Sequence, residues 1–208
     1  MKPNALLFDL DGTLQDTYTI HFQAFRAVFA HFGRELNEQE YQAAYSPNWL
    51  LTYQRLELPP ELWQEADDIW LAEAGKLKPE PFPGVVETLE VLRKTYPLAL
   101  VTAGSKERVL RELAENGLAA YFPVVVTGGD VLHPKPAPDG IQLALEKLGI
   151  ETQECIYVGD TSLDFETAMN AGVRFIGIPS RYASLPPGTP GARLKQFSDL
   201  PDWLSNSV

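Results

Sequence analysis

The chain has 208 residues, of which 45% are apolar, and its formal net charge is −11 at pH 7. This length can bury one ordinary core with a modest second lobe, and the apolar content excludes a wholly disordered chain. The acidic balance argues against a nucleic-acid partner, because phosphate backbones need a basic surface. An anionic substrate would therefore need a local positive centre, such as a metal ion or one or two placed lysines.

The sequence offers no sign of a membrane or secretory protein. No apolar run approaches the roughly 18 residues that span a bilayer. The opening stretch MKPNALLFDLD has too short an apolar run for a signal peptide, and two carboxylates interrupt it. The single cysteine, Cys155, excludes an internal disulfide. We therefore expect a cytoplasmic protein with no membrane partner.

Strand and helix patterns alternate along the chain. The apolar runs that predict buried strands are Ala5–Phe8, Leu98–Val101, Val124–Val126, Ile156–Val158 and Phe175–Ile178. Several are continuously apolar, which is typical of a parallel sheet covered on both faces. The helical stripes between them are Val85, Leu89 and Leu92; Val109, Leu110 and Leu113; and Ile141, Leu145 and Leu148, followed by Gly149 as a C-terminal cap. The alternation predicts an α/β fold with a doubly wound parallel sheet.

The connection between the first two strands is far too long. It has about ninety residues, whereas a crossover needs only about a dozen or more. A helix over 83–94 can be that crossover, so residues 16–82 predict a helical cap domain inserted into a core domain of residues 1–15 and 83–208. Breaks in the cap helices are expected near Gly33, Pro47, Pro59–Pro60 and Pro79–Pro83. Residues 179–191 predict a loop, and a short helix is expected near Asp202.

Polar motifs follow the first two predicted strands, where ligands bind in open α/β sheets. DLDGT (9–13) has the form of an Asp-Gly turn, but two acids flanking one apolar residue directly after a buried strand are less common. TAGS (102–105) offers Ser105 as a helix N-cap. The same hydroxyls and free amides also suit an anion site.

The next two strands also end in polar motifs. HPKP (133–136) places Lys135 between two prolines, which suits a fixed charge, although a loop lysine is usually only solvated. GDTSLD (159–164) contains a capping box that accounts for Asp164 but not for Asp160. Together the motifs gather carboxylates, a lysine and a hydroxyl at one sheet edge. Crowded carboxylates need a cation, and hard oxygen ligands without histidine or cysteine indicate Mg²⁺.

In order and spacing, the four motifs resemble those of the haloacid dehalogenase superfamily of phosphotransferases. The motifs are DLDGTLQD, VTAGS, HPKPAPD and GDTSLDFETAMNAG. The resemblance covers the whole chain and implies a Rossmann-like core. The helical insert resembles the cap of the phosphoglycolate phosphatase and β-phosphoglucomutase branch. The function implied is a Mg²⁺-dependent phosphatase that hydrolyses a small phosphate monoester through an aspartyl phosphate. We also expect the protein to be a monomer.

The resemblance also implies a role for each motif residue. Asp9 would be the nucleophile and a metal ligand. Asp11 would be the general acid and base, with its backbone carbonyl on the metal. The Thr102 hydroxyl and the Ala103 amide would bind phosphate, and Lys135 would steady Asp9 and the transferring group. Asp160 would bind the metal directly, and Asp164 would hold the metal's waters or Lys135.

Several alternatives remain open at this stage. Dehalogenases of the superfamily lack the second acid, so Asp11 disfavours halide displacement. A phosphomutase is the main rival, and His21 resembles the mutase pattern. Against it, Thr13 stands where mutases tend to have valine, and the mutases' cap arginine has no match. The Cys155 thiol is a poor candidate nucleophile, and Gln15 departs from the family's usual apolar residue. The aromatic residues that could line a substrate pocket or form the cap core are Trp49, Tyr53, Trp63 and Trp70.

Overall fold

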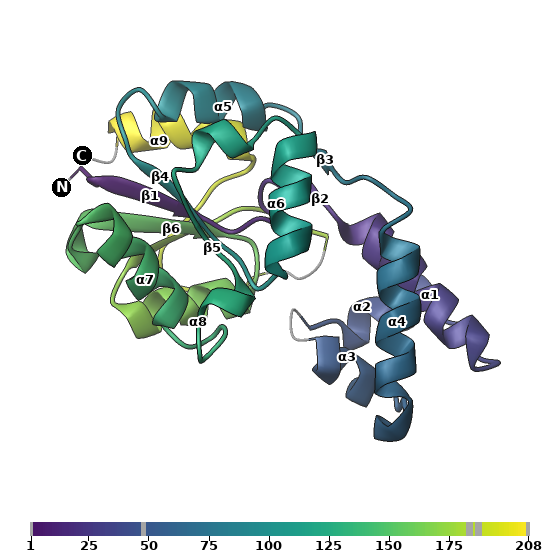
Figure 1. Cartoon of the computed structure of the whole chain (residues 1–208). Helices are drawn as coiled ribbons and strands as arrows, with labels where there is room; N and C mark the ends of the chain where they lie inside the picture. Colours follow the sequence, from purple (N-terminus) through teal and green to yellow (C-terminus); the bar gives the residue numbers. More distant parts are fainter. Residues whose placement is uncertain (1, 47–48, 182–184, 186–188, 207–208) are drawn as a thin grey trace. The chain divides into compact units, whose positions relative to one another are not determined.

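The computed structural model describes residues 2–46, 49–181, 185 and 189–206. The chain divides into two compact units. The core unit comprises Met1–Asp16 and Glu80–Val208, and the inserted unit comprises Thr17–Pro79 (Figure 1).

A six-stranded parallel sheet with the order β5-β4-β1-β6-β7-β8 lies at the centre of the core unit. Its strands are β1 (Ala5–Phe8), β4 (Leu98–Val101), β5 (Val124–Val126), β6 (Cys155–Gly159), β7 (Arg174–Gly177) and β8 (Ala192–Arg193). All residues of β1, β4 and β6 are buried, which explains their continuously apolar sequences. The predicted fold class is confirmed, and the five predicted strands form within one residue at each end. The two-residue β8 was not predicted, because so short a strand carries almost no pattern.

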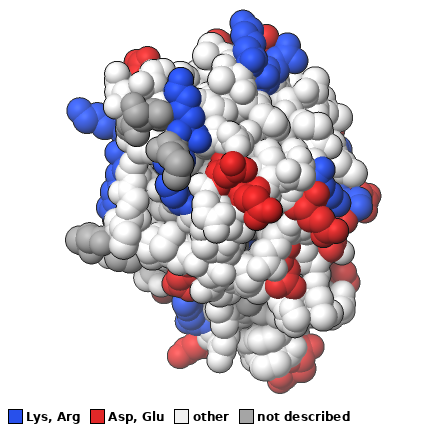
Figure 2. All heavy atoms as spheres, turned by 90° about the vertical axis from the view of Figure 1, so that its left-hand side faces the viewer, with Lys and Arg blue, Asp and Glu red and all other residues white. Residues whose placement is uncertain are grey.

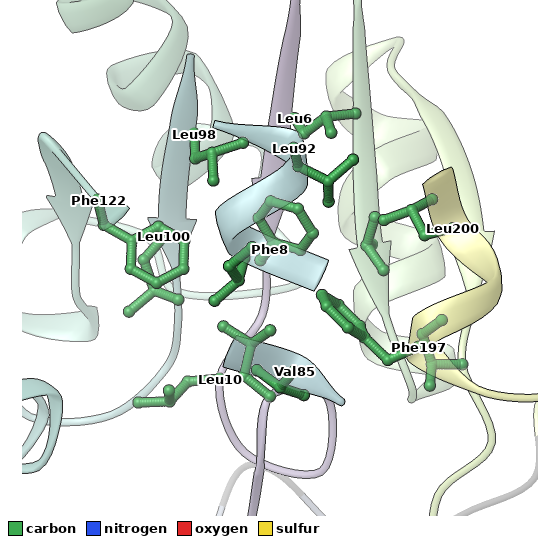
Figure 3. Close-up of a cluster of buried hydrophobic side chains, with 14 of the residues drawn as sticks. Leu6, Phe8, Leu10, Val85, Leu92, Leu98, Leu100, Phe122, Phe197 and Leu200 are labelled. Carbon is green, nitrogen blue, oxygen red and sulfur yellow. The ribbon is translucent and has the colours of Figure 1, made fainter. Parts of the chain in front are cut away.

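Helices cover both faces of the sheet (Figure 1). The core-unit helices are α5 (Val85–Leu92), α6 (Lys106–Glu115), α7 (Asp139–Leu148), α8 (Ser162–Ala171) and α9 (Leu200–Asn206), the last being the helix expected near Asp202. Alternate β1 residues point to opposite faces. Leu6 and Phe8 join an apolar cluster with α5, α6 and α9, whereas Ala5 and Leu7 join one with α7 and α8. Figure 3 shows Phe8 at the centre of the first cluster, with its ring 5.7 Å from that of Phe197.

Short 3₁₀ turns link several of these elements. They are Pro60–Leu62, Ala119–Tyr121, Gly128–Asp130, Thr152–Glu154 and Phe197–Asp199. As predicted, Gly149 ends α7 in the left-handed conformation, with φ of 68°. The predicted stripe of α6 is wrong at Leu110, which is 47% exposed, whereas Glu112 on the same helix is buried. The buried side of α6 therefore contains the polar Glu112, and Leu110 lies outside it.

The inserted unit is helical. Its helices are α1 (Tyr18–His31), α2 (Glu38–Ala44), α3 (Trp49–Arg55) and α4 (Trp63–Ala74). The predicted break near Pro47 lies outside the described residues. Around Phe25 pack the rings of Tyr41 and Tyr53, at 5.2 and 5.4 Å between centroids. Tyr53 is buried as cap core, but Trp49 is 43% exposed, so a core role is wrong for it.

A two-stranded antiparallel sheet joins the two places where the chain leaves and re-enters the core unit. It pairs β2 (Gln15–Asp16) with β3 (Glu80–Pro81). This pairing holds the last two residues of the first motif in a fixed position. Among the described helices, none has both the length and the apolar character to cross a bilayer.

Candidate active site

The loop after β1 is a tight turn that places two carboxylates at the end of the central strand. The amide of Asp9 continues the parallel ladder by donating to the Val158 carbonyl at 2.9 Å. The amides of Thr13 and Leu14 then turn back to the Leu10 carbonyl. Gly12 has φ of 83°, a conformation in which a side chain would be strained. The turn therefore separates the Asp9 and Asp11 side chains and sends them to different partners.

Asp9 and Lys135 form a buried ion pair. The Lys135 ammonium donates to Asp9 Oδ1 at 2.7 Å and to Asp164 Oδ1 at 2.6 Å. Only 6% of the lysine side chain and 9% of the Asp9 side chain are exposed. The structure thus brings together three predicted site residues that lie up to 155 positions apart in the sequence.

Tyr157 completes the surroundings of the lysine, and sequence reasoning missed it. Its hydroxyl, on the middle of β6, accepts from the Lys135 ammonium and donates to the Val101 carbonyl at 2.9 Å. It also lies 3.1 Å from Asp164 Oδ1. A hydroxyl inside an otherwise apolar strand was the available signal, because a buried tyrosine needs a polar partner.

Asp164 uses both carboxylate oxygens within the protein. Its Oδ2 accepts from the Thr161 hydroxyl at 2.6 Å and from the Thr161 amide at 3.1 Å, as the predicted capping box requires. Its Oδ1 accepts from Lys135. Gly159 allows this approach, since an added Cβ there would lie 2.5 Å from Asp164 Cβ. These contacts favour a role for Asp164 in holding the lysine.

Asp160 differs from Asp164 because one of its oxygens has no partner. Its Oδ1 accepts from the Thr13 hydroxyl at 2.9 Å. Its Oδ2 is buried and has no hydrogen-bond partner among the described residues. Buried polar atoms are rarely left unpaired without a reason. Oxygens of Asp9, Asp160 and Asp164 lie within 4.8 Å of one another, so this set fits a hard cation.

The electrostatics of the cluster are those of crowded, desolvated carboxylates. Burial raises the pKa of Asp9 to about 7, although Lys135 opposes the shift. Burial and the charge of Asp164 raise the pKa of Asp160 well above its ordinary value. Burial also disfavours ionised Asp164, but the charge and hydrogen bond of Lys135 lower its pKa below the usual range. One buried lysine therefore stabilises only part of the negative charge, and a cation would stabilise the rest.

Asp11 has a separate partner that sequence reasoning missed, although its charge also helps to raise the pKa of Asp9. Arg108 on α6 donates to Asp11 Oδ2 at 2.6 Å and to Asp11 Oδ1 at 3.1 Å. The predicted site residue Asp11 thus lies in the same turn as Asp9 but is held by another cation.

The phosphate-binding candidates lie at the start of α6. Thr102 is buried, and its hydroxyl accepts from the Gly104 amide at 3.2 Å. Ala103 is exposed. Ser105 occupies the N-cap position of α6 as predicted but makes no side-chain capping bond there. The described geometry therefore leaves the first turn of α6 suited to an anion.

Comparison with known proteins identifies the family. The pattern of the haloacid dehalogenase-like hydrolases matches residues 6–178, so the chain belongs to that family. A pyrophosphatase PpaX from Bacillus pumilus is 31% identical over 95% of this chain and 94% of its own. The fructose-1-phosphate phosphatase YqaB from Escherichia coli is 30% identical over 83% of this chain and 95% of its own.

Among solved structures, a Thermotoga maritima protein provisionally assigned as a β-phosphoglucomutase is also similar. It superposes with a TM-score of 0.75 at 26% identity, covering 99% of this chain and all of that one. Phosphatase-named and mutase-named proteins are thus similar to this chain at 26–31% identity.

The buried position of Lys135 gives a testable consequence for stability. Lys135→Met leaves two buried carboxylates without their cation, so the free energy of unfolding should fall by about 3–5 kcal/mol at neutral pH. In the parent, the pKa of Asp164 is lowered from its ordinary value of 3.8. The ionised Asp164 therefore stabilises the fold at pH values above 3.8, and this contribution is lost as the pH falls further. In the variant both carboxylates bind protons more readily when folded, so the loss should shrink as the pH falls.

Urea unfolding at two pH values, without added metal, measures this effect. The control is Lys106→Met, which removes a surface pair with Asp130 in which the lysine is 63% exposed. It should cost no more than about 1 kcal/mol. Equal losses for the two variants would contradict the buried-pair account.

Proposed function

We propose that the protein is a magnesium-dependent phosphatase that acts on a small phosphorylated metabolite through an aspartyl phosphate on Asp9. The observation that carries the proposal is the Asp9 carboxylate itself. It stands at the end of the central strand, 2.7 Å from a buried lysine and grouped with Asp160. Membership of a hydrolase family and the phosphatase names of its relatives support the same chemistry.

Asp9 would attack the phosphorus atom, forming a bond to phosphorus as the bond to the leaving oxygen breaks. Phosphate ester hydrolysis is extremely slow without a catalyst, and a covalent intermediate divides it into two easier steps. Lys135 fixes Asp9 and offsets part of the repulsion between carboxylate and phosphate. The Thr102 hydroxyl and the Ala103 amide would hold the phosphoryl oxygens at the start of α6.

Asp11 would move the protons. In the first step it gives a proton to the leaving oxygen, and in the second it takes one from the water that attacks the aspartyl phosphate. A group that serves both steps must present its carboxyl beside Asp9 without being the nucleophile. Its place two residues further along the same turn suits that requirement.

The residues present fit a divalent cation with oxygen ligands. Asp9, Asp160 and the backbone carbonyl of Asp11 would hold it, and the unpaired Oδ2 of Asp160 is the atom that most needs it. When bound, Mg²⁺ would supply positive charge that offsets the charge of the transferring phosphoryl group. Asp164 would position Lys135.

Hydrolysis is preferred to isomerisation because a mutase needs a second strong anion site in its cap, best made from arginine. In the inserted unit, the Arg55 guanidinium donates to the backbone carbonyl of Tyr45 at 2.9 Å, and Arg34 donates to that of Leu56. Both arginines are therefore already bonded to the backbone of their own unit. The presence of Thr13 in place of the mutases' valine is weaker support for hydrolysis than the sequence alone indicates. Its hydroxyl is buried and bonded to Asp160, so it supports Asp160.

The substrate proposed is a small monoester, with pyrophosphate as the second candidate because of the PpaX relatives. A polymeric nucleic acid is a poor candidate. The formal net charge is −11, whereas phosphate backbones need a basic surface. On the face shown in Figure 2, both basic and acidic side chains lie in a largely uncharged surface.

The first prediction concerns the metal. Complete removal of divalent ions should abolish phosphate release, Mg²⁺ should restore it, and Zn²⁺ should not replace it, because the donors are all hard oxygens. Asp160→Asn should raise the Mg²⁺ concentration needed, whereas the exposed Asp202→Asn should not. Full activity after chelation would overturn the metal assignment.

The second prediction separates the two acids of the turn. Asp9→Asn should abolish the phosphoenzyme, detected by acid quenching with labelled substrate, while phosphate binding persists. Asp11→Asn should slow turnover by about 10²- to 10⁴-fold, because proton transfer is impaired. Turnover of Asp9→Asn at the parent rate would show that the nucleophile is misassigned.

The third prediction tests hydrolysis against isomerisation. A panel of phosphoglycolate, sugar phosphates, nucleoside monophosphates and pyrophosphate should show phosphate released from at least one compound. Incubation with β-glucose 1-phosphate and a trace of the 1,6-bisphosphate should yield no isomer. Glucose 6-phosphate in excess of free phosphate would favour the mutase instead.

A further inference from the structure

A polar stripe on α6 faces the turn that carries the two acids. The stripe consists of Arg108, Glu112 and the residue just beyond the helix, Asn116, spaced one turn apart. Arg108 binds Asp11, and both Arg108 and Gln15 donate to Glu112 Oε2, at 2.9 and 2.6 Å. Asn116 donates to Gln15 Oε1 at 3.2 Å. The stripe therefore binds the turn at both of its ends.

The pair between Arg108 and Asp11 has the geometry of a two-pronged clamp. Two guanidinium nitrogens meet the two carboxylate oxygens, which fixes the plane of the carboxylate as well as its position. Only 15% of the arginine side chain and 17% of the Asp11 side chain are exposed. An ionised carboxylate has about four lone-pair sites, so the two contacts with Arg108 do not use all of them.

Arg108 is itself held on three sides. Glu112 fixes one of its nitrogens, and Gln15 fixes Glu112. Gly104 lies directly beneath the guanidinium, since a Cβ built on it would be 2.3 Å from Arg108 Nη2. A side chain at position 104 would push the arginine away. Gly104 thus leaves room for the clamp. The unusual Gln15 has a role here too, because it holds Glu112, which in turn holds Arg108.

Building on the proposed role of Asp11 in proton transfer, we propose that Arg108 is a positioning residue that aims the Asp11 carboxylate at the reacting oxygens. It reaches the reaction only through Asp11. Glu112 and Gln15 set the position of Arg108. A buried ion pair adds little net stability compared with apolar packing, so the value of this one lies in orientation.

The test begins with Arg108→Met, which removes the fork and keeps a long side chain. With an alkyl phosphate, kcat should fall about 10- to 100-fold with KM little changed, as expected for a misplaced catalytic group. Arg108→Lys restores charge without the fork and should recover only part of the rate. Arg111→Met, on an exposed site of the same helix, is the matched control and should be neutral.

Two readouts separate positioning from a merely structural role. Nitrophenolate leaves without a proton, so its release from nitrophenyl phosphate in a single turnover should be nearly unchanged in Arg108→Met, although steady-state turnover falls. In an Asp11→Asn background, Arg108→Met should cause little further loss. An equal slowing of nitrophenolate release, or a full additional loss in that background, would overturn the proposal.

Other outcomes distinguish this inference from the proposed function. If Asp11→Asn keeps the parent rate, the role of Asp11 is wrong and the inference is wrong with it. If Asp11→Asn is impaired and Arg108→Met is not, only the inference is wrong. Should Arg108→Met fail to fold, Arg108→Lys decides, because it keeps a buried positive charge beside Asp11 and Glu112 and removes only the fork. It should lower alkyl phosphate turnover and spare nitrophenolate release, and a parent-like profile would overturn the proposal.

Discussion

The constraint on which the site depends is the crowding of negative charge at one edge of the sheet. Five carboxylates, of Asp9, Asp11, Glu112, Asp160 and Asp164, face two buried cations, Lys135 and Arg108. Each cation pairs with two of the acids, and Asp160 has neither. Burial makes this imbalance costly, because desolvation already disfavours the charged forms of Asp9 and Asp160. The proposed divalent cation at Asp160 would offset that imbalance.

The parallel sheet makes such crowding possible. Strands that are buried on both faces can hold charged groups only beyond their ends, and in a parallel sheet the carboxyl ends lie together. β1, β4 and β6 are neighbours, so the turns that follow them meet. The lysine comes from the loop between β5 and α7 and reaches into the group. The apolar clusters on both faces keep these ends fixed, because Phe8, the last residue of β1 before Asp9, is packed within one of them.

Much of the sheet and of the site could be predicted from the sequence, because both apolar runs and polar motifs were available. The five longer strands were predictable because each is a short apolar run, and the motif residues because they follow those runs. Arg108 and Tyr157 were not predictable in the same way. Which side of α6 meets the turn depends on the helix phase, and the apolar pattern misplaced it at Leu110. Tyr157 points at Lys135 only because of the pleat of β6. Gln15 stayed uninterpreted because its partners lie about a hundred positions away.

The two kinds of relatives explain why the reacting residues alone do not identify the substrate. A pyrophosphatase and a sugar phosphatase are about equally similar to this chain, at 31% and 30% identity. Their leaving groups differ in chemistry, however. A sugar alkoxide is a poor leaving group and needs a proton as it departs, whereas phosphate leaving from pyrophosphate is already a weak base. A precisely held proton donor is therefore worth more for an ester than for an anhydride. Arg108 holds Asp11 through one buried ion pair, is itself held by a second one with Glu112, and lies against Gly104. With Asp11 acting as proposed, its orientation matters in both steps for a monoester and chiefly in the second step for pyrophosphate.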